Sequence, residues 1–296
     1  MSSELLIRPL HIDDLAAAEK LSSDSFLELD RRTFQRGWPE PSVRGPARVR
    51  DWIRRSTHLI EGDAGGCWAA EIEGAMVGFA TSFRRDLTWF LATYAVRPES
   101  QGVGIGKPLL EAALTHSHGC LRGMLSGSAD PKAVRRYRQA GFTAHPQMFM
   151  RGTIDRDVLP IVEHVRDGTA GDFDLMNSID RRVRDAAHGR DHELLSSMHR
   201  LIVLDQNSGS GYAYVTPSGE PALLAATNRR TATRLLWEAL AASEPDVEVT
   251  IPHLTPANEW ALDVGFAARL SVYTNGYLAL RGMKPPTPYI HSGALL

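Results

Sequence analysis

Runs of apolar residues separated by turn residues predict several short strands in the first half of the chain. Residues 5–9 form an apolar run, and residues 15–21, preceded by two acidic residues, are rich in good helix formers. Two longer apolar runs, 67–72 and 75–83, are separated by Glu73-Gly74, which is typical of a hairpin turn. A third strand is expected at 87–96. This part of the pattern predicts a strand, a helix and then an antiparallel sheet.

The next region alternates helices and strands. Helices are expected at about 107–117 and 130–140, the second ended by Gly141, with a strand at 121–125 and extended chain at 142–154. Residues 24–56 are charged and contain Pro39, Pro41 and Pro46. Because proline breaks helices, this stretch is expected to be a loop with short helices, one of them at 48–56.

The second half repeats this order of elements. Strands are expected at 161–166, 211–216, 221–226 and 247–251, and helices at 231–242 and 258–264, the latter ended by Gly265. Residues 262–266 also correspond in sequence to residues 138–142. We therefore expect a tandem duplication of the α/β class, each lobe a mixed, mainly antiparallel sheet flanked by helices. The expected domains are residues 1–154 and 161–283, followed by an extended tail at 284–296.

Composition narrows the class of protein. The 296 residues are 43% hydrophobic and 23% charged, as expected for a globular protein of about two domains. The formal net charge of −2 gives no electrostatic footprint for nucleic-acid binding. Two cysteines form no disulfide framework, and neither a signal peptide nor a run of about 18 apolar residues is evident. These features predict a cytoplasmic protein without membrane or nucleic-acid partners.

A glycine-rich loop between a predicted strand and a predicted helix is the main chemical signal. Gly102, Gly104 and Gly106 alternate there, so backbone N–H groups can approach an anion at the positive end of the following helix. Gln101 and Pro108 exclude a Walker loop, and the glycine spacing excludes a dinucleotide fingerprint. A pyrophosphate site fits the loop, and an ordinary glycine-rich turn is the alternative.

Residues 96–106 resemble the acetyl-CoA motif of the GNAT N-acetyltransferase superfamily, Arg/Gln-x-x-Gly-x-Gly/Ala. The resemblance implies that the loop amides bind the cofactor pyrophosphate and that the preceding strand binds the pantetheine arm. On this basis the cofactor-binding residues of the segment are Val96, Gln101, Gly102, Val103, Gly104, Ile105, Gly106 and Lys107.

A second segment also resembles the family, at the helix predicted for 130–140. Asp130, Ala133, Tyr137 and Gly141 follow the family's spacing, with Asp130 in place of the usual Asn. The resemblance implies that Asp130 and Ala133 contact the cofactor and that Tyr137 protonates the leaving thiolate. A core tyrosine is the alternative for Tyr137. Tyr94 is a second catalytic candidate, with a packed strand aromatic as its alternative.

The resemblance implies an acyltransferase that moves an acetyl group from acetyl-CoA to a primary amine of a small molecule or a protein. No carboxylate or His lies in residues 89–96, so the general base is unassigned. A non-catalytic module that senses acyl-CoA or holds a partner is the alternative. Family members commonly shape the acceptor site between the first two helices, which makes Phe34, Trp38 and Trp52 acceptor-side candidates.

The second copy lacks this chemistry. Residues 226–234 contain no glycine, so a degenerate lobe without cofactor is expected. The layout resembles tandem GNAT proteins, and this resemblance implies that the second lobe completes the acceptor site or a homodimer interface. His188 and His192 are spaced as a metal pair, but the segment lacks the Glu of a His-Glu-x-x-His motif and contains Gly189. A solvated polar segment, and no metal, is therefore expected.

Overall fold

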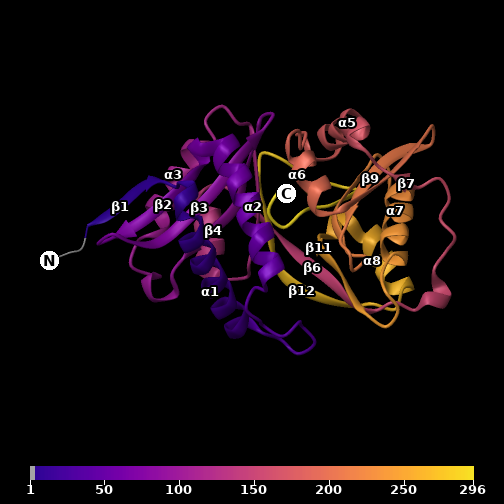
Figure 1. Cartoon of the computed structure of the whole chain (residues 1–296), viewed down its shortest axis with the longest axis horizontal. Coiled ribbons are helices and arrows are strands. Elements are labelled where there is room, and N and C mark those ends of the chain that lie inside the picture. Colours follow the sequence, from indigo (N-terminus) through magenta and orange to yellow (C-terminus); the bar gives the residue numbers. More distant parts are fainter. Residues whose placement is uncertain (1–3) are drawn as a thin grey trace. The chain divides into compact units, whose positions relative to one another are not determined.

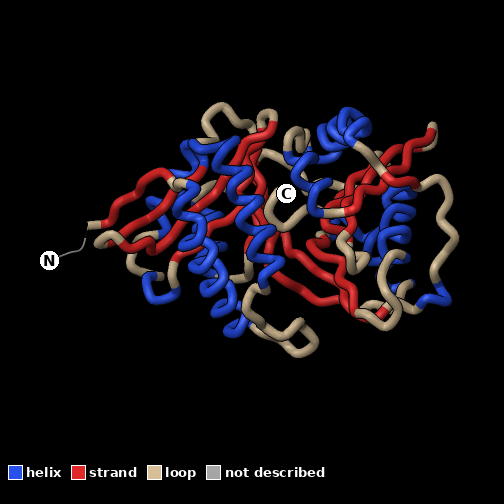
Figure 2. Tube along the Cα trace, viewed as in Figure 1, coloured by secondary structure: helices blue, strands red, loops and turns tan. Residues whose placement is uncertain are grey.

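The computed structural model describes residues 4–296 and confirms the expected α/β class, with two sheets flanked by helices (Figures 1 and 2). Residues 1–3, with which the predicted first domain starts, lie outside the described residues. The chain forms two compact units. Unit 1 is Met1–Arg84 with Trp89–Leu121, and unit 2 is Arg85–Thr88 with Arg122–Leu296.

Unit 1 contains a sheet with the strand order β1-β2-β3-β4. Its helices and strands are β1 Leu5–Pro9, α1 Leu15–Thr33, α2 Pro46–Asp63, β2 Cys67–Ile72, β3 Ala75–Arg85, β4 Thr88–Val96 and α3 Gly106–Thr115, the facing ends of β3 and β4 belonging to unit 2. Glu73 and Gly74 both have positive φ, as a tight hairpin turn requires, so the predicted β2–β3 hairpin is confirmed.

Helices α2 and α3 cover opposite faces of β3. The ring of Phe79 packs edge-on against Trp52 of α2, with ring centroids 5.8 Å apart. A Cβ at the preceding position, Gly78, would meet the Leu109 side chain of α3. Since successive strand residues point to opposite faces, the two helices lie on the two sides of the sheet. This arrangement fixes the start of α3 relative to the end of β4.

The expectation of a loop with short helices over 24–56 is wrong for most of its length. Helix α1 continues to Thr33, because no proline or glycine interrupts it, and Arg31 and Arg32 in its last turn complement the helix dipole. Helix α2 begins with Pro46 at its first position, where the missing N–H costs nothing. Only residues 34–45 lie outside helices.

Unit 2 contains two groups of strands, ordered β5-β12-β6-β11 and β13-β10-β9-β8-β7. Its strands are β5 Arg122–Gly127, β6 Thr143–Thr153, β7 Arg166–Asp167, β8 Arg200–Gln206, β9 Gly209–Val215, β10 Pro221–Ala226, β11 Glu248–Leu254, β12 Ser271–Arg281 and β13 Tyr289–Ile290. Its helices are α4 Pro131–Gln139, α5 Phe173–Arg184, α6 Asp191–Met198, α7 Arg229–Ala241 and α8 Glu259–Ala267.

Strands from the two halves of the sequence interleave within unit 2. Strand β12, near the end of the chain, pairs antiparallel with β5 on one side and with β6 on the other, and β6 also pairs with β11. A bulge in β12 brings Gly276, with φ +67°, close to the carbonyl of Gly127 in β5. The domains predicted from the sequence divide the chain into a first and a second half. Their boundaries at residues 154 and 161 stay a prediction.

The second sheet of unit 2 separates an apolar layer from a polar one. In β9, Ala213 and Val215 belong to the main hydrophobic core, which also contains Leu235 and Leu236 of α7. The alternate residues Tyr212 and Tyr214 point to the other face, where their hydroxyls contact residues of α5 and α6. Figure 1 shows α7 and α5 among the labelled helices of this unit.

Two boundaries in the second half differ from expectation. The predicted strand at 161–166 is reduced to Arg166–Asp167, with Ile161 94% exposed and Arg166 paired instead with Asp172 at the start of α5. Helix α8 does not end at Gly265 but continues to Ala267. Gly265 is needed for packing, since a Cβ there would overlap the sulfur of Met150. Gly141, by contrast, ends α4 in the left-handed conformation, as predicted.

Over residues 4–296, the structure contains no helix with the length and apolarity needed to cross a membrane. The predicted extended tail is docked rather than free. Tyr289 and Ile290 form β13 on the edge of β10, and Leu295 and Leu296 are buried.

Acid is expected to destabilise unit 2 through two stacked histidines, His253 and His291, whose ring centroids are 4.3 Å apart. Burial lowers the pKa of His253 from 6.5 to about 4 and that of His291 well below 6.5. Between pH 6.5 and pH 4 the histidines of the unfolded chain bind more protons than those of the folded chain. The free energy of unfolding therefore falls as the pH drops from about 6.5 to about 4.

Urea unfolding at a series of pH values measures this loss of stability. The variant His253→Gln is expected to reduce the loss by up to about 3 kcal/mol. The matched change at the exposed His164 serves as the control and is expected to leave the pH dependence unchanged. An unaltered pH dependence in His253→Gln contradicts this assignment.

Candidate functional site

The loop between β4 and α3 has a backbone that only glycine adopts easily. Gly102 has φ +87° and Gly104 has φ +100°, and a Cβ at either position would meet nothing within 4 Å. The two glycines are therefore required by conformation, and the space beside them is open. Val103 between them is 73% exposed, whereas Ile105 is buried and anchors the end of the loop. The loop exposes its backbone while its end is fixed in the core.

The start of α3, which follows this open space, has no side-chain cap among residues 4–296. The backbone of Ile105, at the cap position, is already helical. Pro108 has no N–H, which leaves the amides of Gly106 and Lys107 at the positive end of the helix dipole. The Lys107 side chain is 67% exposed, and its Nζ lies 3.8 Å from Glu111 Oε1. An exposed ion pair of this length is weak. The arrangement suits an anion such as a phosphate group.

Gly106 is required for a different reason, namely close packing with Tyr94. The Tyr94 hydroxyl donates a hydrogen bond of 2.7 Å to the carbonyl of Gly106. A Cβ on Gly106 would overlap the hydroxyl oxygen of Tyr94. Tyr94, proposed from the sequence as a catalytic candidate, thus fastens β4 to the first residue of α3.

Gln101 and Val96 are joined directly. The side-chain amide of Gln101 donates to the Val96 carbonyl at 3.0 Å, and the hydroxyl of Ser25 in α1 lies 3.4 Å from the same oxygen. These contacts fix the last residue of β4 and the first residue of the loop. The structure therefore brings Val96, Gln101 and Gly106 into one hydrogen-bonded framework. Ser25 had no sequence signal, because it lies in a different element far from the motif.

Tyr137 lies in unit 2, on the inner face of α4. Asp130 caps this helix by accepting a hydrogen bond from the Lys132 amide at 2.8 Å. Tyr137 is 8% exposed, and its ring packs on Gly127 of β5, where a Cβ would be only 3.0 Å from the ring. Ala133, one turn earlier, is half-buried. A bare glycine beneath the ring sets the orientation of the tyrosine.

The three acceptor-side candidates lie in different environments of unit 1. Phe34, just after α1, is 44% exposed, and Trp38 lies in the following loop. Trp52 is only 3% exposed, packed against Phe79 and beneath the guanidinium of Arg44, 5.7 Å from its ring centroid. Of the three, Phe34 and Trp38 have surface available for a ligand.

The corresponding helix start in the second half of the chain is built differently. Asn228 precedes α7, and its side chain accepts a hydrogen bond of 2.9 Å from the Thr231 amide while donating to the carbonyl of Ser208. The side chain itself thus occupies the position in which an anion would bind the helix amides. Arg234, one of three arginines here, is engaged with Gln206 and the carbonyl of Glu163.

The expectation of a solvated segment around His188 and His192 is wrong. Both side chains and that of Asp180 are completely buried in unit 2, between α5, α6 and β9. Burial raises the pKa of Asp180, but the neighbouring His188 and Arg184 outweigh it and hold that pKa far below its usual value. Burial, reinforced by Arg184, lowers the pKa of His188 to about 4. No periodicity around the histidines signals this burial, because it depends on Tyr212 and Tyr214 from a distant strand.

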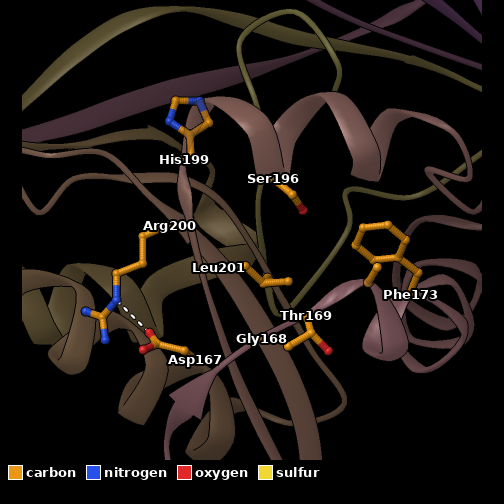
Figure 3. A pocket seen from close by; sticks show the side chains of 9 residues that line it. Asp167, Gly168, Thr169, Phe173, Ser196, His199, Arg200 and Leu201 are labelled. Carbon is orange, nitrogen blue, oxygen red and sulfur yellow. Dashed lines mark hydrogen bonds and ion pairs between the residues drawn. The ribbon is translucent and has the colours of Figure 1, made fainter.

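Unit 2 also contains a cavity of about 440 Å³, and Figure 3 shows side chains that line it. Phe173 and Ser196 lie on its wall, and an ion pair of 2.8 Å between Arg200 and Asp167 lies at its edge. The cavity lies entirely within unit 2 and is lined by Asp167, Gly168, Thr169, Ala170, Phe173, Ser196, His199, Arg200 and Leu201.

Part of the chain is similar to a known protein family. Residues 23–142 match the model of the acetyltransferase (GNAT) family. A comparison with curated proteins found no match. A putative acetyltransferase from Pyrococcus horikoshii is 19% identical over 98% of this chain and 95% of that chain, with a TM-score of 0.72.

Two further solved structures resemble the chain. GCN5-related N-acetyltransferases from Sphaerobacter thermophilus and Kribbella flavida have TM-scores of 0.58 and 0.60 at 17% and 15% identity. They cover 98% and 94% of this chain, and 96% and 71% of their own chains. At these identities the similarity shows a shared fold.

The Tyr94–Gly106 contact is testable by a double-mutant cycle. Gly106→Ala is expected to cost about 1–3 kcal/mol, because the new methyl group overlaps the Tyr94 hydroxyl. In a Tyr94→Phe background the same change is expected to cost less than about 1 kcal/mol, since the overlapping oxygen is gone. Gly45→Ala, at a position with nothing within 4 Å, is the control. Equal costs of Gly106→Ala in both backgrounds, measured by urea unfolding, contradict the contact.

Proposed function

Because residues 23–142 match the model of the acetyltransferase (GNAT) family, we propose that this protein transfers an acetyl group from acetyl-CoA to a primary amine. The observation that supports the donor most strongly is the loop geometry. Gly102 and Gly104 have positive φ beside open space, next to a helix start without a side-chain cap. Backbone amides in this arrangement bind a pyrophosphate such as that of coenzyme A.

The proposed roles of the remaining residues follow from their contacts. Gln101 holds the Val96 carbonyl, so the end of β4 is fixed where the resemblance places the pantetheine arm. Tyr94 holds the carbonyl of Gly106 and thereby the first turn of α3. These two side chains are positioning residues that keep the amides of the loop preorganised.

In the proposed reaction the neutral amine attacks the thioester carbonyl carbon, a C–N bond forms and the C–S bond breaks. Tyr137 is the proposed acid, its phenol giving a proton to the leaving thiolate. The amine loses its proton to water, since the described part of β4 from Trp89 to Val96 carries no carboxylate or histidine. Backbone N–H groups polarise the thioester carbonyl.

The proposed acceptor is the amine of a small molecule or of a protein, in the cytoplasm. Phe34 and Trp38 are the proposed acceptor-side residues with exposed surface, and Trp52 supports them from the core. A homodimer remains part of the proposal. The absence of a strand carboxylate and the presence of Asp130 instead of Asn favour one second candidate, a module that binds acyl-CoA without turnover.

The donor site is tested by calorimetric titration with acetyl-CoA. The variant Gly104→Glu is expected to weaken binding at least about tenfold, because a side chain at φ +100° strains the loop and its carboxylate repels the phosphates. Gly74→Glu adds the same charge at a position that also has positive φ and open space, but lies in the β2–β3 turn. This control is expected to bind like the original protein.

Two results would overturn the proposed donor. One is that the original protein does not bind acetyl-CoA. The other is that Gly104→Glu and Gly74→Glu bind it with equal affinity.

The acid is tested with Tyr137→Phe in a thiol-release assay against a panel of amines. Loss of the phenol proton is expected to lower kcat by about 100-fold while acetyl-CoA affinity is retained. Tyr277→Phe, on the neighbouring strand β12, is the matched control and keeps kcat. Acetyl-CoA binding without release of thiol for any amine would support the non-catalytic module instead.

A further inference from the structure

Three potential metal ligands meet in the interior of unit 2. Asp180 lies on α5, His192 on α6 and His188 in the segment between these helices. Each side chain is completely buried, and one ligand atom from each lies within 4.8 Å of the others. Asp180 Oδ2 is 2.8 Å from His188 Nδ1 and 3.2 Å from His192 Nε2. Both imidazoles are thus close to the same carboxylate oxygen.

His192 Nε2 is buried without a hydrogen bond to any part of the chain over residues 4–296. It is close to Asp180 Oδ2, but the two atoms are not aligned for a hydrogen bond. A buried polar atom of this kind is uncommon in folded proteins and requires an explanation.

Tyr214 indicates which nitrogen of His192 carries the proton. Its hydroxyl donates to the main-chain carbonyl of His192, and its oxygen lies 3.2 Å from His192 Nδ1. Because the single phenol proton goes to the carbonyl, the oxygen accepts from Nδ1–H. The neutral ring then has a lone pair on Nε2, 3.2 Å from a carboxylate oxygen. Two electron-rich atoms this close repel each other unless a cation binds both.

The spacing fits such a cation. Metal–ligand bonds of about 2.0–2.2 Å in a tetrahedral zinc site place neighbouring ligand atoms about 3.3–3.5 Å apart. The 3.2 Å between Asp180 Oδ2 and His192 Nε2 is close to this value, whereas the 2.8 Å between Asp180 Oδ2 and His188 Nδ1 is the distance of a hydrogen bond, whose proton an ion would replace.

A second set of contacts orients the ligands, as is typical of metal centres. Tyr212 donates a hydrogen bond of 2.5 Å to Asp180 Oδ1, and the main-chain amide of His188 donates one of 3.2 Å to Oδ2. Tyr289 Oη lies 3.5 Å from His188 Nε2, the nitrogen that keeps its proton when Nδ1 binds a metal. The Tyr212 oxygen, 3.3 Å from His188 Nδ1, is the nearest further oxygen donor.

The cavity of Figure 3 gives an ion a short route to the cluster. The ring of Phe173, on the cavity wall, stacks on the His192 ring with centroids 5.4 Å apart. Ser196, also on the wall, contacts the Tyr214 hydroxyl at 3.2 Å. The side chain of Phe173 therefore lies between the cavity and His192, and that of Ser196 between the cavity and the Tyr214 hydroxyl.

We propose that Asp180, His188 and His192 form a binding site for one divalent transition-metal ion of the Zn²⁺ type. Two imidazoles and one carboxylate favour zinc or cobalt over magnesium or calcium, which prefer all-oxygen ligand sets. Arg184, whose guanidinium donates to the carbonyls of Ala186, Ala187 and Leu296, adds a nearby positive charge that limits the affinity. The site is independent of the proposed acetyl transfer.

The site is tested on the full chain, treated with a chelator and then titrated with Co²⁺ and with Zn²⁺. One ion per chain is expected, with visible Co²⁺ absorption typical of a tetrahedral site and a raised melting temperature with Zn²⁺. His192→Phe keeps the ring that stacks on Phe173 but removes the ligand nitrogen, so binding is expected to weaken at least about 100-fold.

His199→Phe is the matched control, because His199 lines the same cavity but supplies none of the three ligand atoms. The variant His199→Phe is expected to bind both ions like the original protein.

His188→Gln is a second ligand variant, to be used if His192→Phe does not fold, and it is also expected to lose binding of both ions. Absence of stoichiometric binding in the original protein, or unchanged affinity in the folded ligand variants, overturns the proposal.

Discussion

The pairing of β12 with both β5 and β6 is the interaction on which unit 2 depends. Strand β12, near the end of the sequence, lies between β5 and β6, which are close to each other in the first half of the sequence. The bulge at Gly276 lets β12 approach the carbonyl of Gly127, and the ring of Tyr137 packs over that same glycine. The second half of the chain therefore supports the strand that orients the proposed acid, although its own helix start at α7 is closed by Asn228.

Local chemistry made the glycine-rich loop between β4 and α3 predictable from the sequence. Alternating glycines before a helix indicate a specific backbone geometry, and Gly102 and Gly104 adopt it. The sequence also indicated that Gly106 was special but not why, since its partner Tyr94 contacts it across the fold. The β2–β3 hairpin and the Gly141 helix end followed from turn chemistry in the same way.

Features that depend on distant pairing were not predictable. The interleaving of β12 leaves no trace in the hydrophobic pattern, because a strand reads the same whichever neighbour it has. Gly265 resembled a helix end, yet it admits the Met150 side chain of β6. The histidines of the Asp180 cluster looked solvated because the tyrosines that bury them lie on β9, and only the fold brings these residues together.

The docking of Tyr289 and Ile290 on β10 has a consequence for self-association. Strand β10, Pro221–Ala226, is almost entirely apolar, and without β13 its outer backbone groups would form an open sheet edge. Such an edge is a template on which another chain can add a strand, which is a common start of aggregation. A two-residue segment thus protects the most apolar border of the second sheet against misassembly.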